Sequence, residues 1–142
     1  MNYHFKVHEE KTGYWAECLE LKGCLTQGDS MEDLKKNMEE ALYLYLDEPF
    51  GSNAAFPLPD DSIAEAPDLF SLAVDPKQAF SIILRNYRIR NRMTQAAFQH
   101  KLGMRNRNSY ARLENRANPS LETICRIKTA FPDFPIEKVF HS

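Results

Sequence analysis

Apolar and polar side chains alternate at the start of the chain, over residues 3–8 and again over residues 14–19. A period of two is typical of β-strands with one buried face. Gly13 lies between the two segments and can adopt the positive φ of a hairpin turn. We therefore predict two antiparallel strands, followed by a short third strand over residues 23–27.

After Ser30 the apolar spacing changes to three and four residues, which is the period of an amphipathic helix. Ser30 is a good N-cap, and Asp33 stands where a capping box has its acidic residue. Pro49 and Gly51 end the pattern. We expect this helix to lie on the sheet through one apolar face. That face consists of Met31, Leu34, Met38, Ala41, Leu42, Tyr45 and Leu46.

Residues 49–68 contain four prolines and several acidic side chains, which predicts a loop. Alternation returns at Phe70, Leu72 and Val74, and we expect a fourth strand there. The resulting order, ββ(β)αβ, is that of a small α+β domain, to which we assign residues 1–74.

The second half of the chain has a helical pattern throughout. Asp75 and Pro76 form a strong helix start, and the apolar spacing continues the helix to about Asn91. Its apolar residues are Phe80, Ile83, Leu84 and Tyr87. The arginines between and beyond them are expected to extend into solvent, namely Arg85, Arg88, Arg90 and Arg92.

Four further short helices are expected to follow. Thr94 and Ser120 are suited to cap the second and fourth helices of this half, and the third begins near Asn106 or Arg107. A short helix near the end of the chain completes the set. Five helices of this length predict a compact all-α domain, to which we assign residues 75–142.

Charge divides the chain at the same place. Residues 1–70 carry 5 Lys+Arg against 15 Asp+Glu, a formal −10, whereas residues 71–142 carry 13 against 5, a formal +8. This asymmetry indicates two modules with different partners, and it makes the basic module a candidate for nucleic-acid binding. The acidic module would repel a nucleic-acid backbone and attract a positively charged protein surface.

Composition excludes several classes of protein. A hydrophobic content of 43% with 11% aromatic residues is too high for a disordered chain. No apolar run approaches the ~20 residues of a membrane span, and the first residues lack the apolar segment of a signal peptide. Three cysteines without a CxxC pair argue against a zinc site or a disulfide framework. We expect a cytoplasmic protein with reduced thiols and no membrane association.

A series of short motifs occupies residues 13–46 and the loop after them. They are Gly13-Tyr14-Trp15-Ala16, Gly23-Cys24, Thr26-Gln27-Gly28-Asp29-Ser30, Glu39-Glu40-Ala41 and the prolines that follow. Together they resemble the N-terminal domain of HicB antitoxins, although Lys22 stands where family members often have proline. The resemblance implies a partial RNase H-like fold that binds and neutralises a HicA toxin, a small basic protein that cleaves mRNA.

A second set of motifs recurs at a characteristic spacing in the basic half. They are Thr94-Gln95, Leu102-Gly103, Arg112-Leu113-Glu114-Asn115 and Asn118-Pro119-Ser120-Leu121. This spacing resembles the Xre/Cro-type helix-turn-helix over about residues 77–140, and the segment MRNRNSYARLE resembles the version found in some HicB proteins. The resemblance implies that the second helix of the pair enters the major groove of DNA.

Alignment back from Leu113 assigns three base-facing positions, Arg107, Asn108 and Arg112. Arginine can grip guanine, and asparagine can grip adenine, each through two hydrogen bonds. The remaining predicted contacts are to phosphates, which set the register of the protein on the duplex. The full set of predicted DNA-binding residues is Gln95, Arg105, Asn106, Arg107, Asn108, Arg112, Asn115 and Arg116. The predicted core of this half includes Tyr110, Ala96, Ala97, Phe98, Leu102, Leu113, Ile124 and Ile127.

No catalytic constellation is evident in the sequence. An RNase H-like site needs several carboxylates around metal ions, and Glu17 and Asp29 near the predicted strands do not form such a set. His4 and His8 share one face of a strand, but they lie ~13 Å apart by strand rise, too far to share a metal ion. We interpret them as surface side chains and expect a protein that is not an enzyme and needs no cofactor or metal.

The two halves resemble the two parts of one architecture in the expected order. We therefore interpret the chain as the antitoxin of a type II HicAB-like system, which neutralises a HicA-like ribonuclease toxin and represses its own operon by binding operator double-stranded DNA. One such domain contacts one half-site, so a homodimer or a tetramer is expected. Apolar residues 131–140 are a candidate dimer surface or, equally, part of the core.

Two alternatives stay open from the sequence. The first is a stand-alone helix-turn-helix repressor whose N-terminal domain senses a small ligand. The second is a nuclease that uses N-terminal carboxylates and a divalent metal. A neighbouring reading frame for a small basic protein would favour the antitoxin over the ligand sensor.

Overall fold

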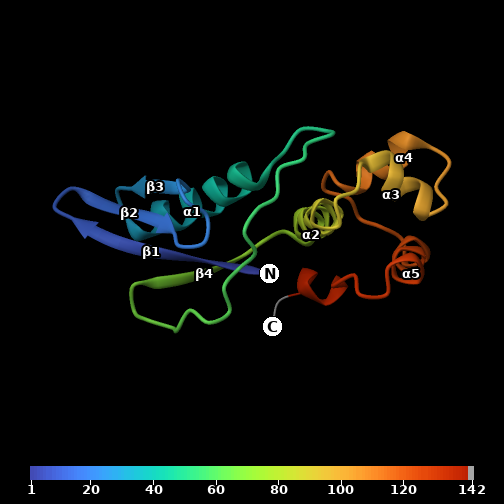
Figure 1. Ribbon diagram of the computed structural model, residues 1–142. Coiled ribbons are helices and arrows are strands. Elements are labelled where there is room, and N and C mark those ends of the chain that lie inside the picture. The colour runs from blue at the N-terminus through green and yellow to red at the C-terminus, as the bar shows by residue number, and fades with distance from the viewer. Residues whose placement is uncertain (141–142) are drawn as a thin grey trace. The chain divides into compact units, whose positions relative to one another are not determined.

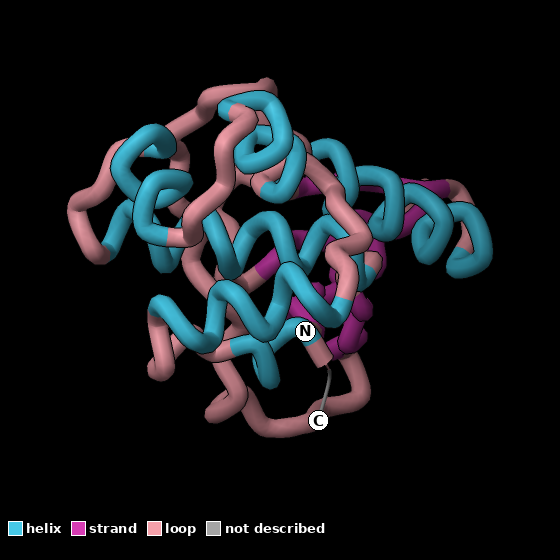
Figure 2. The backbone as a smooth tube through the Cα atoms, turned by 90° about the vertical axis from the view of Figure 1, so that its right-hand side faces the viewer, coloured by secondary structure: helices cyan, strands magenta, loops and turns pink. Residues whose placement is uncertain are grey.

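A computed structural model describes residues 1–140, apart from the Arg107 side chain, and it confirms the predicted α+β class (Figure 1). The described residues divide into two compact units. Residues 1–47 and 56–74 form the first unit, and residues 48–55 and 75–140 form the second. The strands found among these residues, magenta in Figure 2, all belong to the first unit.

The first unit is built on an antiparallel sheet of strand order β3-β2-β1-β4. Within the described residues its strands are β1 (Asn2–Glu10), β2 (Gly13–Cys18), β3 (Leu25–Gly28) and β4 (Leu69–Ala73). The predicted third strand begins two residues too early. Gly23 has a positive φ of 88°, and the Cys24 amide donates to the carbonyl of Leu21, so these residues form a turn before the strand begins.

Helix α1 (Met31–Leu46) packs on one face of the sheet, as predicted. The Ser30 hydroxyl accepts a hydrogen bond from the Asp33 amide at 3.1 Å, which caps the helix. Its buried residues recur every four positions, at Leu34, Met38, Leu42 and Leu46. They complete a core with Tyr3, Phe5 and Ala16, whose side chains are fully buried.

β3 and α1 approach each other closely at Gly28. A Cβ atom on this glycine would lie 2.7 Å from the amide nitrogen of Leu34 and 2.9 Å from its Cα. Both are backbone atoms, so neither can move aside as a flexible side chain would. A side chain at position 28 is therefore incompatible with the observed distance between strand and helix.

The second unit is helical. Its elements are α2 (Pro76–Arg90), α3 (Gln95–Lys101), α4 (Arg107–Leu113), α5 (Leu121–Ala130) and the 3-10 helix η1 (Ile136–Val139). The four α-helices have side-chain N-caps at Asp75, Thr94, Asn106 and Ser120. The predicted helix starts are therefore confirmed, since a helix was expected to begin at or next to each of these residues.

The prediction that four arginines in and just after α2 extend into solvent is wrong for two of them. Arg85 is 3% exposed and Arg88 is 2% exposed, whereas Arg90 and Arg92 are exposed. Residues 48–55 pack in this unit and supply acceptors to Arg88. The sequence-based division had kept this segment with the first module.

Two further expectations about the core need correction. Ala96 and Ala97 are exposed on α3 rather than buried, because the short helix faces the core through Phe98 instead. Near the end of the chain Phe131, Phe134 and Val139 are buried within the chain, and Phe140 is 67% exposed. Most of the apolar C-terminal residues are therefore core, and not a free dimer surface.

The histidines of β1 are not plain surface side chains. His4 Nδ1 lies 2.6 Å from Glu20 Oε2, and both residues are half-buried. The ring of His8 stacks on Trp15 with centroids 4.0 Å apart. No helix within residues 1–140 has the length and apolar character needed to cross a membrane, and no three potential metal ligands among the described residues come together.

Candidate nucleic-acid interface

Helices α3 and α4 are positioned by local sequence signals. The Thr94 hydroxyl accepts from the Ala97 amide at the start of α3, and the Asn106 side chain accepts from the Asn108 amide at the start of α4. Gly103, between the helices, has a φ of 69°, a conformation that favours glycine. The chain can therefore turn sharply from α3 into α4.

A cluster of aromatic side chains packs between these two helices and α2. Phe98 of α3 stacks on Phe131 with centroids 4.4 Å apart and planes 10° apart, and it contacts the Tyr110 ring of α4 at 5.4 Å. Tyr87 of α2 meets both Phe98 and Phe131 edge-on. Offset and edge-on aromatic pairs add to the free energy gained from burial, so α2, α3 and α4 are fixed to one another through these rings.

A buried ion pair joins α2 to the end of α4. Arg88 Nε lies 2.7 Å from Glu114 Oε2, and Arg88 Nη2 lies 3.0 Å from Glu114 Oε1, which is a bidentate geometry. Glu114 is only 5% exposed. Burial by itself lowers the pKa of Arg88, but hydrogen bonding to the Glu114 carboxylate outweighs it and the net pKa is raised.

The Glu114 carboxylate also binds two neutral donors. The Tyr110 hydroxyl donates to Oε2, and the Gln95 amide donates to Oε1 at 3.2 Å. Burial and the Glu114 charge both raise the pKa of Tyr110, so its hydroxyl stays protonated and remains a donor. One carboxylate therefore connects α2, the first residue of α3 and α4.

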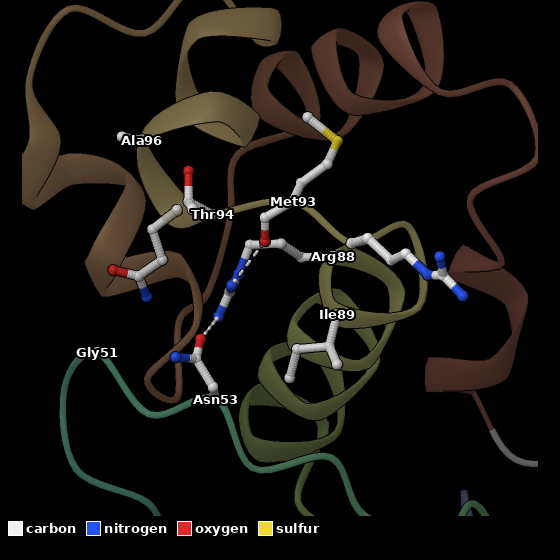
Figure 3. A pocket seen from close by; sticks show the side chains of 9 residues that line it. Gly51, Asn53, Arg88, Ile89, Met93, Thr94 and Ala96 are labelled. Carbon is white, nitrogen blue, oxygen red and sulfur yellow. Dashed lines mark hydrogen bonds between the residues drawn. The ribbon is translucent and has the colours of Figure 1, made fainter.

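The 48–55 segment completes the surroundings of Arg88. Arg88 Nη2 donates to Asn53 Oδ1 at 3.1 Å and to the Ser52 carbonyl at 3.3 Å, while Nη1 donates to the Met93 carbonyl. Figure 3 shows Asn53 directed at Arg88 across a pocket that Thr94 and Ala96 also line. The guanidinium is thus satisfied by one nearby carbonyl and by two groups that lie more than 30 residues away in sequence.

Arg85 is buried one turn before Arg88 and has a different environment. Its Nε has no hydrogen-bond partner among the described residues. Burial lowers its pKa, and the nearby carboxylates of Glu114 and Glu48 partly offset this effect. The charge of Arg85 is therefore compensated over a distance rather than by a direct ion pair.

The predicted DNA-binding residues fall into three groups. Gln95 and Asn115 are half-buried and bind internally, to Glu114 and to the Glu48 carbonyl respectively. The Arg107 side chain lies outside the described residues. The exposed group consists of Arg105, Asn106, Asn108, Arg112 and Arg116, of which Asn106 serves as the N-cap of α4 and Arg116 has a positive φ of 53°.

The two faces of α4 differ in character. Asn108 and Arg112 are four residues apart, so they share one face of the helix, and both are exposed. Tyr110 and Leu113 are buried, as predicted. Residues 76–121 contain a single acidic residue, Glu114, which is buried and paired. The exposed surface of α4 and its flanking turns therefore carries basic and amide groups without a competing carboxylate.

Sequence reasoning missed the buried pair of Arg88 and Glu114. A signal for it was available, because Phe80, Leu84 and Arg88 are spaced by four residues and so lie on one stripe of α2. Glu114, as the lone acid in a long basic segment, was the natural partner. The contribution of Asn53 had no comparable signal, since it depends on a contact across 35 residues.

Comparison with known proteins identifies relatives of part of the chain. No protein-family model matches it. The chain is 38% identical over 50 residues to a UPF0150 protein of Helicobacter pylori, which covers 35% of this chain and 69% of the relative. It is also 38% identical over 61 residues to a UPF0150 protein of Synechocystis, which covers 41% of this chain and 77% of the relative.

Proposed function

The chain belongs to the UPF0150 family, which is the HicB-like family, and on this premise we propose that it is the antitoxin of a type II toxin–antitoxin pair. In this proposal the first unit neutralises a HicA-like ribonuclease toxin, and the second unit binds operator DNA and represses the operon. The protein acts by binding, without catalysis. Dimers that recognise a pseudo-palindromic operator are part of the same proposal.

The observation that carries the DNA-binding part is the exposed face of α4. Asn108 and Arg112 stand on it side by side, and Arg105 lies in the turn before it. These groups can form two-point hydrogen bonds with adenine and guanine edges in the major groove. Because the one carboxylate of the region is buried against Arg88, it does not repel phosphates from this face.

Gln95 and Asn115 form hydrogen bonds within the second unit, and through them they help to position α4 in this mechanism. Gln95 is held by Glu114, and Asn115 donates to the carbonyl of Glu48 at 3.5 Å. Both residues stand at the borders of the α3–α4 pair, where phosphate contacts would set the docking angle. We expect their substitution to alter affinity through the position of α4 as well as through lost contacts.

Charge supports the assignment of the toxin to the first unit. This unit carries 5 Lys+Arg against 14 Asp+Glu, a formal −9, whereas the second carries 13 against 6, a formal +7. An acidic surface accelerates encounter with a basic protein. The same surface disfavours binding of the first unit to nucleic acid.

Variants on α4 test the DNA-binding role. Arg112→Ala and Asn108→Ala should each weaken operator binding by roughly 1–3 kcal/mol and relax the preference at one base pair, as should Arg107→Ala. Gel-shift titration on the promoter fragment of the gene measures the change. Lys138→Ala, an exposed charge on η1, is the matched control and should bind normally. Unchanged affinity in all α4 variants would refute the proposed interface.

Co-expression tests the antitoxin role. The small basic reading frame next to the gene should arrest growth when expressed alone, and this chain should restore growth and co-purify with its product. The α4 variants should still restore growth, since the toxin is assigned to the other unit. Loss of rescue in those variants would contradict the division of roles.

A further inference from the structure

The face of the sheet opposite α1 presents side chains from three neighbouring strands. Register brings Trp15 of β2 opposite His8 of β1 and opposite Gln27 of β3. Glu10 and Leu25 occupy positions of the same parity, so they share this face. Among the described residues β3 is the edge strand of the sheet, so this face ends there, and the Gln27 carbonyl accepts a hydrogen bond from the Asn37 side chain at 2.7 Å.

These side chains line a hollow of about 780 Å³ beside β3. We call it the edge groove and define it by Glu10, Trp15, Leu25, Gln27 and Asp29. The Leu25 side chain is 59% exposed, which is unusual because leucine side chains are mostly buried in folded proteins. None of the residues that line the groove is Lys, Arg or His.

Trp15 is fixed in place before any partner arrives. The His8 ring stacks on its indole with planes 13° apart, and His8 Nε2 lies 3.0 Å from Glu17 Oε2. The indole thus stacks on a ring that Glu17 holds in turn, so it loses little conformational freedom on binding. Preorganised aromatic side chains of this kind are typical of the central residues of protein interfaces.

The groove has the chemistry that receives a basic side chain. Carboxylates at Glu10 and Asp29 can pair with a guanidinium or ammonium group, and the Gln27 amide can accept a further hydrogen bond. An indole attracts a cation placed over its ring, and the Leu25 side chain can cover the aliphatic stem of an arginine or lysine. A nucleic-acid backbone would instead be repelled by the two carboxylates.

We propose that the edge groove is the docking site on the first unit for an arginine- or lysine-bearing segment of the basic toxin. This assignment rests on the proposed antitoxin function and specifies where the toxin binds. The excess of acidic residues in the first unit brings the toxin close, and the groove then fixes it through Trp15 and the two carboxylates. The exposed face of α1, although also acidic, contributes only to the long-range attraction.

Two variants with equal charge change separate the groove from general electrostatics. Glu10→Arg introduces a positive charge into the groove, and Glu40→Arg makes the same change on the exposed face of α1. With the purified product of the neighbouring basic reading frame as the probe, Glu10→Arg in the full-length chain should raise the Kd on the order of 100-fold. Glu40→Arg should raise it by no more than about threefold.

A second measurement does not depend on the charge reversal. Trp15 is the one tryptophan of the chain, so the full-length wild type should change its tryptophan emission on addition of a tryptophan-free variant of the same probe. Leu25→Ala should weaken binding without loss of folding, because its side chain is already exposed. Circular dichroism and operator binding of each variant serve as checks that both units are intact.

The outcomes distinguish the groove from the antitoxin role itself. Equal losses for Glu10→Arg and Glu40→Arg, or an unchanged Trp15 emission on binding, would overturn the groove while leaving the antitoxin function in place. A wild-type chain that neither binds the probe nor restores growth would overturn both. If Glu10→Arg abolished self-association in the absence of the probe and left probe binding unchanged, the groove would be a contact between copies of this chain instead.

Discussion

The buried Glu114 carboxylate connects three helices of the second unit. Its carboxylate accepts from Arg88, Tyr110 and Gln95, which belong to three different helices. A buried ion pair contributes modestly to stability as a whole, but removal of one partner leaves an uncompensated charge in the interior. The arrangement therefore makes single substitutions far more damaging than their size suggests.

We predict that Glu114→Gln lowers the free energy of unfolding by about 3–5 kcal/mol, because Arg88 stays charged and buried without its counter-ion. Urea denaturation followed by circular dichroism measures the loss. Glu122→Gln, an exposed acid on α5, is the control and should change stability by no more than about 0.5 kcal/mol. A loss in Glu114→Gln as small as in the control would show that the pair is not structural.

The three cysteines should differ sharply in reactivity. Burial raises the pKa of Cys18 to about 12 and that of Cys24 to about 11, so at pH 8 almost none of either thiol is the reactive thiolate. Cys125 is exposed on α5. A thiol-specific chromogenic reagent at pH 8 should titrate one thiol rapidly in the native protein and three in denaturant. Rapid titration of two thiols in the native state would contradict the burial of the first-unit cysteines.

Among single residues, helix caps were the most predictable. Ser30, Asp75, Thr94 and Ser120 each accept a hydrogen bond from the first turn of a helix, as expected from sequence. Caps depend on neighbours two or three positions away, and therefore the local sequence is sufficient. The burial of Arg85 and Arg88 was not predicted, because whether an arginine is buried depends on acceptors that come from distant segments.

At the scale of elements, β3 and α1 can pack closely because Gly28 has no side chain. We predict that Gly28→Ala destabilises the first unit by about 1–3 kcal/mol, since its Cβ would meet the backbone of Leu34 and force strand and helix apart. Thermal unfolding followed at the Trp15 emission detects the change. Gln27→Ala, an exposed position on the same strand, should have little effect on the transition. An alanine at 28 that leaves the midpoint unchanged would refute the close approach.

Regular elements were predictable where periodicity was clear, as in α1 and the first hairpin. β3 was displaced in the prediction because Gly23 and Cys24 look extended in sequence but form a turn. The 48–55 segment was assigned to a loop of the first module, and nothing in its own composition indicates that it packs with α2. Its place is determined by Arg88, which lies more than 30 residues later.

At the scale of the whole molecule, the two units carry opposite net charges, which predicts a negatively charged partner for one and a positively charged partner for the other. Both interactions should weaken as the salt concentration rises. Operator affinity should fall linearly on a double-logarithmic plot against salt concentration, because phosphate contacts release counter-ions. Association with the basic toxin should slow as salt rises, because screening shortens the range of attraction. Stopped-flow and gel-shift titrations at several salt concentrations measure both.

Charge reversal on α1 gives the matching variant. The double substitution Glu32→Lys with Glu39→Lys should slow toxin association at low salt and leave operator affinity unchanged. At high salt the association rates of variant and wild type should converge. A variant that associates as fast as wild type at low salt would show that the acidic residues of α1 do not steer the toxin.

Within residues 1–140 the chain passes between the two units three times, after residues 47, 55 and 74. A gene fragment cut at residue 74 would contain the whole sheet, but it would also remove Ser52 and Asn53 from the unit that they complete. A single nick within residues 48–55 has a different outcome. The two pieces would still share one sheet, since β1 lies in one piece and β4 in the other. The protein should therefore tolerate a break in this loop, because the two fragments can still associate and fold together. Residues 75–142 expressed alone should be less stable, because they lack Ser52 and Asn53.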